Sequence, residues 1–190
     1  SQRPRAAWDA RMKQPARSKL PIVVVLPGIM GSELFYDDKS VWLSTGAMVA
    51  GRMEHLAPDI DLKAPSVMAV AYERLLVAAD KRYRVLPWPY DWRRPILATG
   101  LRLRRQLVDL EAAQPGVPIH LLAHSMGGLV ARAALFGPDQ ADAFADSAPA
   151  NLTTNDGPAL WARMRARGGR LLMLGTPNTG SYAPVQLLAQ

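Results

Sequence analysis

Leu121-Leu-Ala-His-Ser-Met-Gly-Gly-Leu-Val-Ala-Arg132 places one serine between a short apolar run and a helical one. A sharp turn from a strand into a helix brings two backbones close together, so the residues two before and two after the serine must be small. Ala123 and Gly127 meet that requirement. Such a turn holds the serine in a sparsely populated backbone conformation and lifts its hydroxyl above the sheet edge. The stretch therefore predicts Ser125 as a nucleophile, against the alternative of an ordinary helix-capping serine.

A helix is predicted directly after this serine, over residues 126–136. Gly137 is expected to supply a left-handed cap, and Pro138 cannot continue the helix. The positive end of the helix dipole would face an oxyanion formed at Ser125. The turn thus places the predicted nucleophile at the positive end of a helix dipole, which would stabilise a negatively charged oxyanion.

Acyl transfer needs two backbone amides aimed at the oxyanion, one after the nucleophile and one from a loop after an early strand. The loop Pro27-Gly-Ile-Met-Gly-Ser32 follows the apolar run 22–26. Gly28 lets that backbone approach a ligand closely. We therefore predict the Met126 and Ile29 amides as the oxyanion hole, against the alternative of a glycine turn without a ligand.

Short apolar runs alternate with helical stretches along the chain. Residues 22–26 read Ile-Val-Val-Val-Leu without polar alternation, which is typical of a strand buried on both faces of a parallel sheet. The order predicts a mostly parallel α/β sheet with flanking helices and ligands beyond the carboxyl ends of the strands. Strands are expected over residues 22–26, 83–86, 119–122 and 170–174, and helices over residues 67–81, 95–113 and 126–136.

The composition is that of a globular protein, with 190 residues, 49% hydrophobic and 21% charged. The absence of cysteine excludes disulfides and thiolate chemistry. No run approaches the roughly 18 apolar residues of a membrane span, and no signal-peptide core is visible near the start. Localisation is left open, with the cytoplasm as the default expectation.

Most of the net charge of +7 lies in residues 1–20, which carry +5 of it. We expect a basic flexible tail there, either attracted to an anionic lipid surface or acting as a solubilising arm. Nucleic acid is not an expected partner. A second basic set recurs at alternate positions before a strand, which suits a solvated surface or a phosphate contact; it comprises Arg163, Arg165, Arg167 and Arg170.

Residues 32–65 interrupt the alternation of strands and helices and are predicted as a lid or cap-like excursion. Their apolar side chains, Trp42 among them, either pack on the core or offer an apolar surface to substrate or membrane. Periodicity does not separate the two alternatives, and we favour packing.

Four motifs occur in order between Leu26 and about Ser181: LPGIMGS, WPYDWR, LLAHSMGG and LGTPNTGS. Together they resemble the lecithin:cholesterol acyltransferase family of α/β-hydrolases, with its lipase and phospholipase relatives. The resemblance implies transfer of an acyl group from a lipid or other ester through an acyl-serine at Ser125, without a metal or organic cofactor. It also places residues 32–65 where the family carries its lid and membrane-contacting excursion, here without the disulfide of some relatives.

Two of these motifs are expected to line the site. Asp91 and Arg93, after a strand end, could form a buried pair that fixes the loop beside the nucleophile. Alternatively, Trp92 or Arg93 contacts substrate, because an aromatic face suits acyl chains and a guanidinium suits an anionic head. The loop 176–181 is expected to shape the pocket wall.

A general base for the serine is not visible in the sequence. In this fold the partners follow in the order Ser, Asp or Glu, then His, yet no Asp, Glu or His follows Asp156. We expect the acid and base beyond Gln190, so residues 21–190 would be a partial α/β-hydrolase domain that needs downstream residues or a complementing chain.

None of the three histidines substitutes easily. His124 adjoins the nucleophile on the strand and points to the opposite face, and His120 begins that strand at its far end. His55 could reach Ser125 only if the excursion folded over it. The acidic residues after the turn are expected to be solvated charges; they are Asp139, Asp142, Asp146 and Asp156.

The sequence thus predicts a serine-dependent acyl hydrolase or acyltransferase acting on lipid-like esters. A rival of another class is a catalytically inactive remnant that binds a lipid, a partner protein or a membrane through the Trp42 region and the basic tail. A peptidase or thioesterase is a third alternative, since these enzymes share the same turn chemistry.

Overall fold

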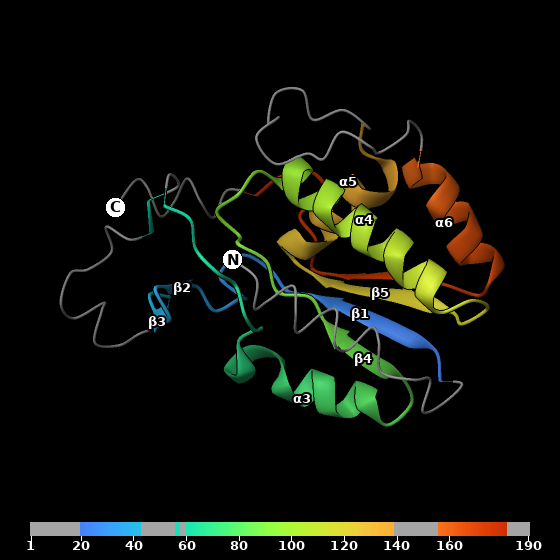
Figure 1. The fold of residues 1–190 in the computed structure, drawn as a ribbon, viewed down its shortest axis with the longest axis horizontal. Helices are drawn as coiled ribbons and strands as arrows, with labels where there is room; N and C mark the ends of the chain where they lie inside the picture. The colour runs from blue at the N-terminus through green and yellow to red at the C-terminus, as the bar shows by residue number, and fades with distance from the viewer. Residues whose placement is uncertain (1–19, 43–55, 58–59, 139–155, 182–190) are drawn as a thin grey trace.

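The computed structural model describes residues 20–42, 56–57, 60–138 and 156–181, and these contain a four-stranded, fully parallel sheet of order β4-β1-β5-β6 (Figure 1). The predicted parallel α/β arrangement is confirmed, with boundaries shifted by one or two residues. The strands are β1 (Ile22–Leu26), β4 (Arg84–Pro87), β5 (Ile119–His124) and β6 (Leu171–Leu174).

Helices flank the sheet on both faces. In the pairing of β1 with β5, Val24 lies beside Leu121 and Leu26 beside Ala123, and these side chains share one core with α4, α5 and α6. The alternate residues face α3 instead, on the other side of the sheet (Figure 1). The helices are α3 (Ala69–Asp80), α4 (Ile96–Ala113), α5 (Met126–Phe136) and α6 (Asp156–Ala166).

The carboxyl ends of β1 and β5 form a topological switch point. The connection from β1 to β4 carries α3, whereas the connection from β5 to β6 carries α5 and α6 on the opposite face. Neighbouring strands whose connections diverge leave a crevice between their ends, which is where open α/β sheets bind ligands. The loop 27–32 and the turn at Ser125 both start there.

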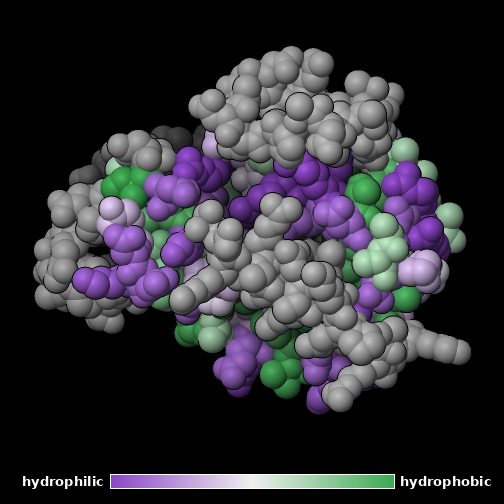
Figure 2. All heavy atoms as spheres, viewed as in Figure 1, coloured by the Kyte–Doolittle hydropathy of each residue, from purple (hydrophilic) through white to green (hydrophobic). Residues whose placement is uncertain are grey.

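The core is built around β1, whose residues are at most 6% exposed. This burial on both faces explains why the strand carries no polar alternation. Leu103, Leu107 and Leu110 of α4 are fully buried against the sheet at helical spacing. Hydrophilic residues gather over the outward side of α4 (Figure 2).

The described part of the excursion contains a hairpin with its own small core. Strands β2 (Phe35–Tyr36) and β3 (Lys39–Ser40) are joined by two aspartates with φ of 45° and 62°, as in the type I′ turn of two-residue hairpins. Leu34, Val41 and Leu62 are buried together beneath it. Packing, the favoured alternative, is confirmed for these residues; residues 43–55 lie outside the described part.

Two sequence expectations are corrected. Gly137 has φ −72° and ψ 164°, which is extended and not left-handed. Glycine is needed there for space, because a Cβ would lie 2.4 Å from the Ala133 carbonyl oxygen. Arg163 and Arg165 belong to α6, a helix that the sequence did not predict, and Arg163 binds the buried Glu111 at 2.9 Å. Part of the second basic set is therefore structural.

Within the described ranges, no helix combines the length and apolarity needed to cross a membrane. The same residues contain no group of three or more potential metal ligands among His, Asp and Glu. The predicted tail lies almost wholly outside the described residues.

Candidate active site

Ser125 occupies a strained turn between β5 and α5. Its φ of 50° and ψ of −124° are rare for a residue with a side chain and cost roughly 1–3 kcal/mol. Its N–H donates to the Leu174 carbonyl at 2.8 Å, and its carbonyl accepts from the Gly128 N–H at 3.0 Å. The predicted strained conformation is confirmed, and the nucleophilic role remains a prediction.

The loop after β1 lies directly against this turn. A Cβ on Gly28 would lie 3.0 Å from the Ser125 Cβ, and a Cβ on Gly127 would lie 2.5 Å from the Pro27 carbonyl oxygen. Both glycines therefore permit a close approach that larger residues would prevent. The Tyr90 hydroxyl donates to the same Pro27 oxygen at 2.8 Å and fixes the start of the loop.

Backbone amides are available on both sides of the serine. Met126 is the first residue of α5, so its N–H has no acceptor within the helix. Among the described residues, none accepts a hydrogen bond from the Ile29 N–H, whereas the Gly28 N–H is bound to the Tyr72 hydroxyl at 2.8 Å. This distribution suits Ile29 and Met126, and not Gly28, as oxyanion donors.

The two tryptophans predicted to contact substrate pack against each other next to the loop after β1. Trp42 and Trp92 pack edge to face, with ring centroids 5.3 Å apart. Trp42 Nε1 donates to the Met30 carbonyl at 3.0 Å, and Trp92 Nε1 donates to the Ser32 carbonyl at 3.3 Å. Their polar atoms thus brace the loop, while their ring faces are half-buried.

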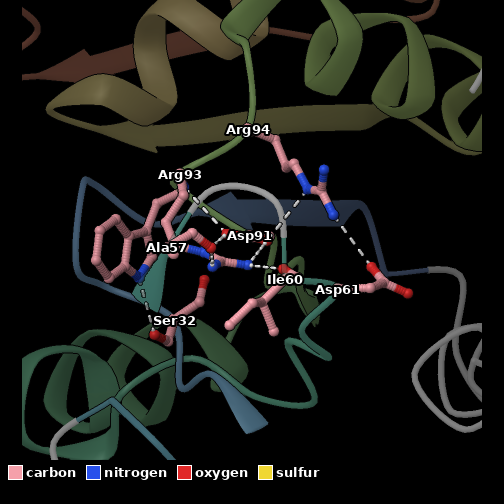
Figure 3. A network of polar contacts seen from close by, with 8 residues as sticks. Ser32, Ala57, Ile60, Asp61, Asp91, Arg93 and Arg94 are labelled. Atoms are coloured by element: carbon pink, nitrogen blue, oxygen red, sulfur yellow. Dashed lines mark hydrogen bonds and ion pairs between the residues drawn. The ribbon is translucent and has the colours of Figure 1, made fainter. Parts of the chain in front are cut away.

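A buried ion pair connects this region to the excursion. Arg93 Nη2 lies 2.7 Å from Asp91 Oδ2, and the two side chains are 4% and 8% exposed. The same guanidinium donates to the carbonyls of Ala57 at 2.6 Å and Ile60 at 2.8 Å (Figure 3). The predicted buried pair is confirmed, and Arg93 is thereby occupied with the protein's own oxygens.

The loop after β6 packs against the start of α5; its role in shaping a pocket wall remains a prediction. The Thr176 side chain lies so close to Gly128 that a Cβ there would be 1.9 Å from the Thr176 Oγ1. Arg132 Nη1 donates to Asn178 Oδ1 at 2.9 Å and ties the loop to α5. The motifs around residues 28, 92, 125 and 176 are therefore brought together at the carboxyl ends of the strands.

No histidine or carboxylate of the described residues hydrogen-bonds to the Ser125 hydroxyl. His124 projects toward α3, and His120, the second residue of β5, lies at the far end of that strand beside Tyr83, as expected. His55 and the aspartates at 139, 142 and 146 lie outside the described residues.

Sequence reasoning missed Tyr72. This α3 residue is 4% exposed, and its hydroxyl contacts both the loop after β1 and His124. Its two partners are 44 and 52 residues away, so no local motif signals the contact.

A groove of about 730 Å³ is lined by the carboxyl half of α6 and by the residues up to the start of β6. Its lining includes Trp161, Arg165 and Arg170 but none of the residues around Ser125. The groove and the strained serine are separate features of the fold.

Neither a family model, nor a curated protein, nor a solved structure matches this chain. Function is therefore inferred from the geometry around Ser125 together with the four motifs.

Proposed function

We propose that the protein is a serine-dependent acyl hydrolase or acyltransferase of the α/β-hydrolase type, with Ser125 as nucleophile. The observation that carries the proposal is the strained backbone of Ser125, with φ 50° and ψ −124°, at the end of a parallel strand. Such strain persists only where the surroundings over-determine it, and it is concentrated at functional sites. In the first step the serine oxygen attacks an ester carbonyl while its proton passes to a base, and the alcohol leaves. Water or a second alcohol then takes the acyl group.

The oxyanion formed in this step would accept hydrogen bonds from the Met126 and Ile29 amides. Met126 directly follows Ser125 in the chain. Ile29 directly follows Gly28, whose backbone closely approaches Ser125. Loss of one such donor in other enzymes lowers the rate by about 100- to 1,000-fold.

A lipid-like ester is the substrate class that the surface beside the serine favours. Ile29 and Met30 are 48% and 38% exposed on the loop after β1. Adjacent exposed apolar side chains at a reacting centre suit an acyl chain better than a polar peptide. The motif resemblance supports the same class.

A binding module without catalysis is the second candidate. It is favoured by the absence of a base bonded to Ser125 among the described residues. In that case the exposed Ile29 and Met30 would hold an apolar ligand without cleaving it.

Covalent labelling of the natural protein with a fluorophosphonate separates the two candidates. Peptide mapping should find the adduct on Ser125, and Ser125→Ala should abolish both labelling and hydrolysis of a soluble nitrophenyl ester. Ser66→Ala is the matched control, since Ser66 bonds to Glu33 before α3 and should leave labelling unchanged. Ester cleavage that survives Ser125→Ala would contradict the enzyme proposal.

A further inference from the structure

Tyr72 bridges the two segments that carry the proposed nucleophile and the proposed loop amide. Its hydroxyl oxygen accepts the Gly28 N–H at 2.8 Å and lies 2.8 Å from His124 Nδ1. Gly28 directly precedes Ile29, and His124 directly precedes Ser125. One hydroxyl, supplied by α3, therefore contacts the neighbour of each reacting group.

The Tyr72 hydroxyl can complete this bridge with either tautomer of the His124 ring. Its oxygen accepts the Gly28 N–H, and it then either donates its own hydrogen to a bare Nδ1 or accepts a second hydrogen bond from an Nδ1–H. Burial raises the pKa of Tyr72, with a smaller opposing effect from the Gly28 amide, so the hydroxyl keeps its proton at neutral pH.

The surroundings hold this hydroxyl in one place. Tyr72 is 4% exposed, and a Cβ on Gly31 would lie 2.8 Å from its oxygen. The rings of Tyr72 and His124 meet edge to face with centroids 5.8 Å apart. The Tyr72 end of the bridge is therefore packed on several sides, whereas the His124 ring is exposed.

The bridge also decides which loop amide is available. Because the Gly28 N–H is bound to Tyr72, it cannot donate to a substrate oxygen. The Ile29 N–H, with no acceptor among the described residues, is left for that task. A change in the bridge would move this amide relative to the serine.

We propose that Tyr72 is a positioning residue of the acyl-transfer site, whose hydroxyl links the Gly28 amide to the His124 ring and so sets the spacing between the Ile29 amide and Ser125. This inference rests on the proposed function. A displacement of about 1 Å at a reacting centre can lower a rate by roughly 100-fold, so the link has a measurable consequence.

Tyr72→Phe in the natural protein removes only the hydroxyl. We expect kcat for a soluble nitrophenyl ester, and the rate of fluorophosphonate labelling, to fall at least about tenfold, with KM changed less than about twofold. His124→Leu should have the same effect, and the double variant should be no slower than either single one. His124→Asn keeps a hydrogen-bonding group near the Nδ1 position and should retain most of the rate.

A purely structural bond would lower the melting temperature of Tyr72→Phe without this loss of kcat, and His124→Asn would then bring no rescue. Wild-type labelling at Ser125 together with an unchanged rate in Tyr72→Phe would overturn this inference and leave the proposed function standing. Absence of labelling in the wild type would overturn both. Nitrogen-15 NMR of His124 gives a readout that is independent of activity: the Nδ1 chemical shift should change in Tyr72→Phe, and an unchanged shift would also overturn the bridge.

Discussion

A Cβ on Gly127 would lie 2.5 Å from the carbonyl oxygen of Pro27, and 2.7 Å from that of Leu26. Both obstacles are backbone atoms at the end of β1, so neither can rotate away. Gly127→Ala should therefore push α5 from the loop that carries Ile29, although alanine is the better helix former by about 1 kcal/mol. We expect a net loss of about 2 kcal/mol in unfolding free energy, measured by urea denaturation, and a strong loss of Ser125 labelling.

Gly116→Ala is the control for this substitution. Gly116 has φ +77°, and beyond its chain neighbours none of the described residues comes within 4 Å of the place that a Cβ would take. Its cost of about 1–2 kcal/mol therefore comes from backbone strain alone. Gly116 lies before the amino end of β5, at the opposite end of the strand from Ser125. Its substitution should therefore leave labelling intact. Equal labelling in the two variants would show that the contact with Pro27 does not position the site.

Arg93→Met should detach the excursion from the end of β4. The substitution leaves the Asp91 carboxylate buried and removes the donors to Ala57 and Ile60. Breaking a buried pair costs about 3–5 kcal/mol, and we expect the lower end of this range because the more distant, partly exposed Arg94 still contacts the Asp91 carboxylate. Urea denaturation should show this loss, and hydrogen exchange should show faster exchange of the Val41 amide, which donates to Leu34 within the excursion.

Arg94→Met tests the same idea at a neighbouring residue. Arg94 also contacts Asp91, at 3.4 Å, but it is 41% exposed, so its loss should cost less than about 1 kcal/mol. Similar costs for the two arginine variants would contradict the anchoring role of Arg93.

Arg104→Met should destabilise the carboxyl end of α5. The Arg104 side chain is 1% exposed, and it donates to the carbonyls of Ala134 at 2.6 Å and Gly137 at 2.8 Å. Carbonyls at the end of a helix have no donor within the helix, and the guanidinium also complements the negative end of the dipole. We expect a loss of about 2–3 kcal/mol in urea denaturation.

Arg102→Met is the matched control, one half-turn away on α4. Its guanidinium lies 5.0 Å from the centroid of the Trp88 ring, a contact worth about 0.5–1 kcal/mol at an exposed site. If Arg104→Met were as mild as this control, the buried guanidinium would not be capping α5.

Sequence reasoning succeeded where a local rule sets the structure. The uninterrupted apolar run 22–26 can only be satisfied by burial on both faces, and it forms the central strand. Small residues flank Ser125 because two backbones meet there, and Gly127 indeed touches Pro27. In both cases the physical constraint acts within a few residues of the signal.

Sequence reasoning failed where contacts between segments far apart in the chain determine the structure. Helix α6 contains Gly157 and two arginines, and its sequence shows no clear apolar face. It is held by the burial of Leu160 and Met164 and by the ion pair with Glu111. Tyr72 reads as one more apolar residue of an amphipathic helix. Only the fold brings its hydroxyl to Gly28 and His124.

Stability should fall between pH 7.5 and pH 5 in part through His120. Burial lowers the pKa of His120 below its ordinary value of 6.5, and the positive charge of Arg170 lowers it further. The unfolded chain therefore takes up this proton at a higher pH than the folded one. The contribution of His120 to stability is present above pH 6.5 and is lost as the pH falls through the lowered folded pKa.

His120→Gln removes this titration while keeping a polar side chain beside Tyr83. Unfolding free energies from urea denaturation at pH 7.5 and pH 5 should differ less in His120→Gln than in the wild type, because all other titrating groups are shared. Arg170→Gln should reduce the difference only in part, since burial is the larger cause. If the variant and the wild type lost the same free energy over this range, the histidine would not be destabilising the folded state when protonated, and the pH dependence would have to arise from other groups.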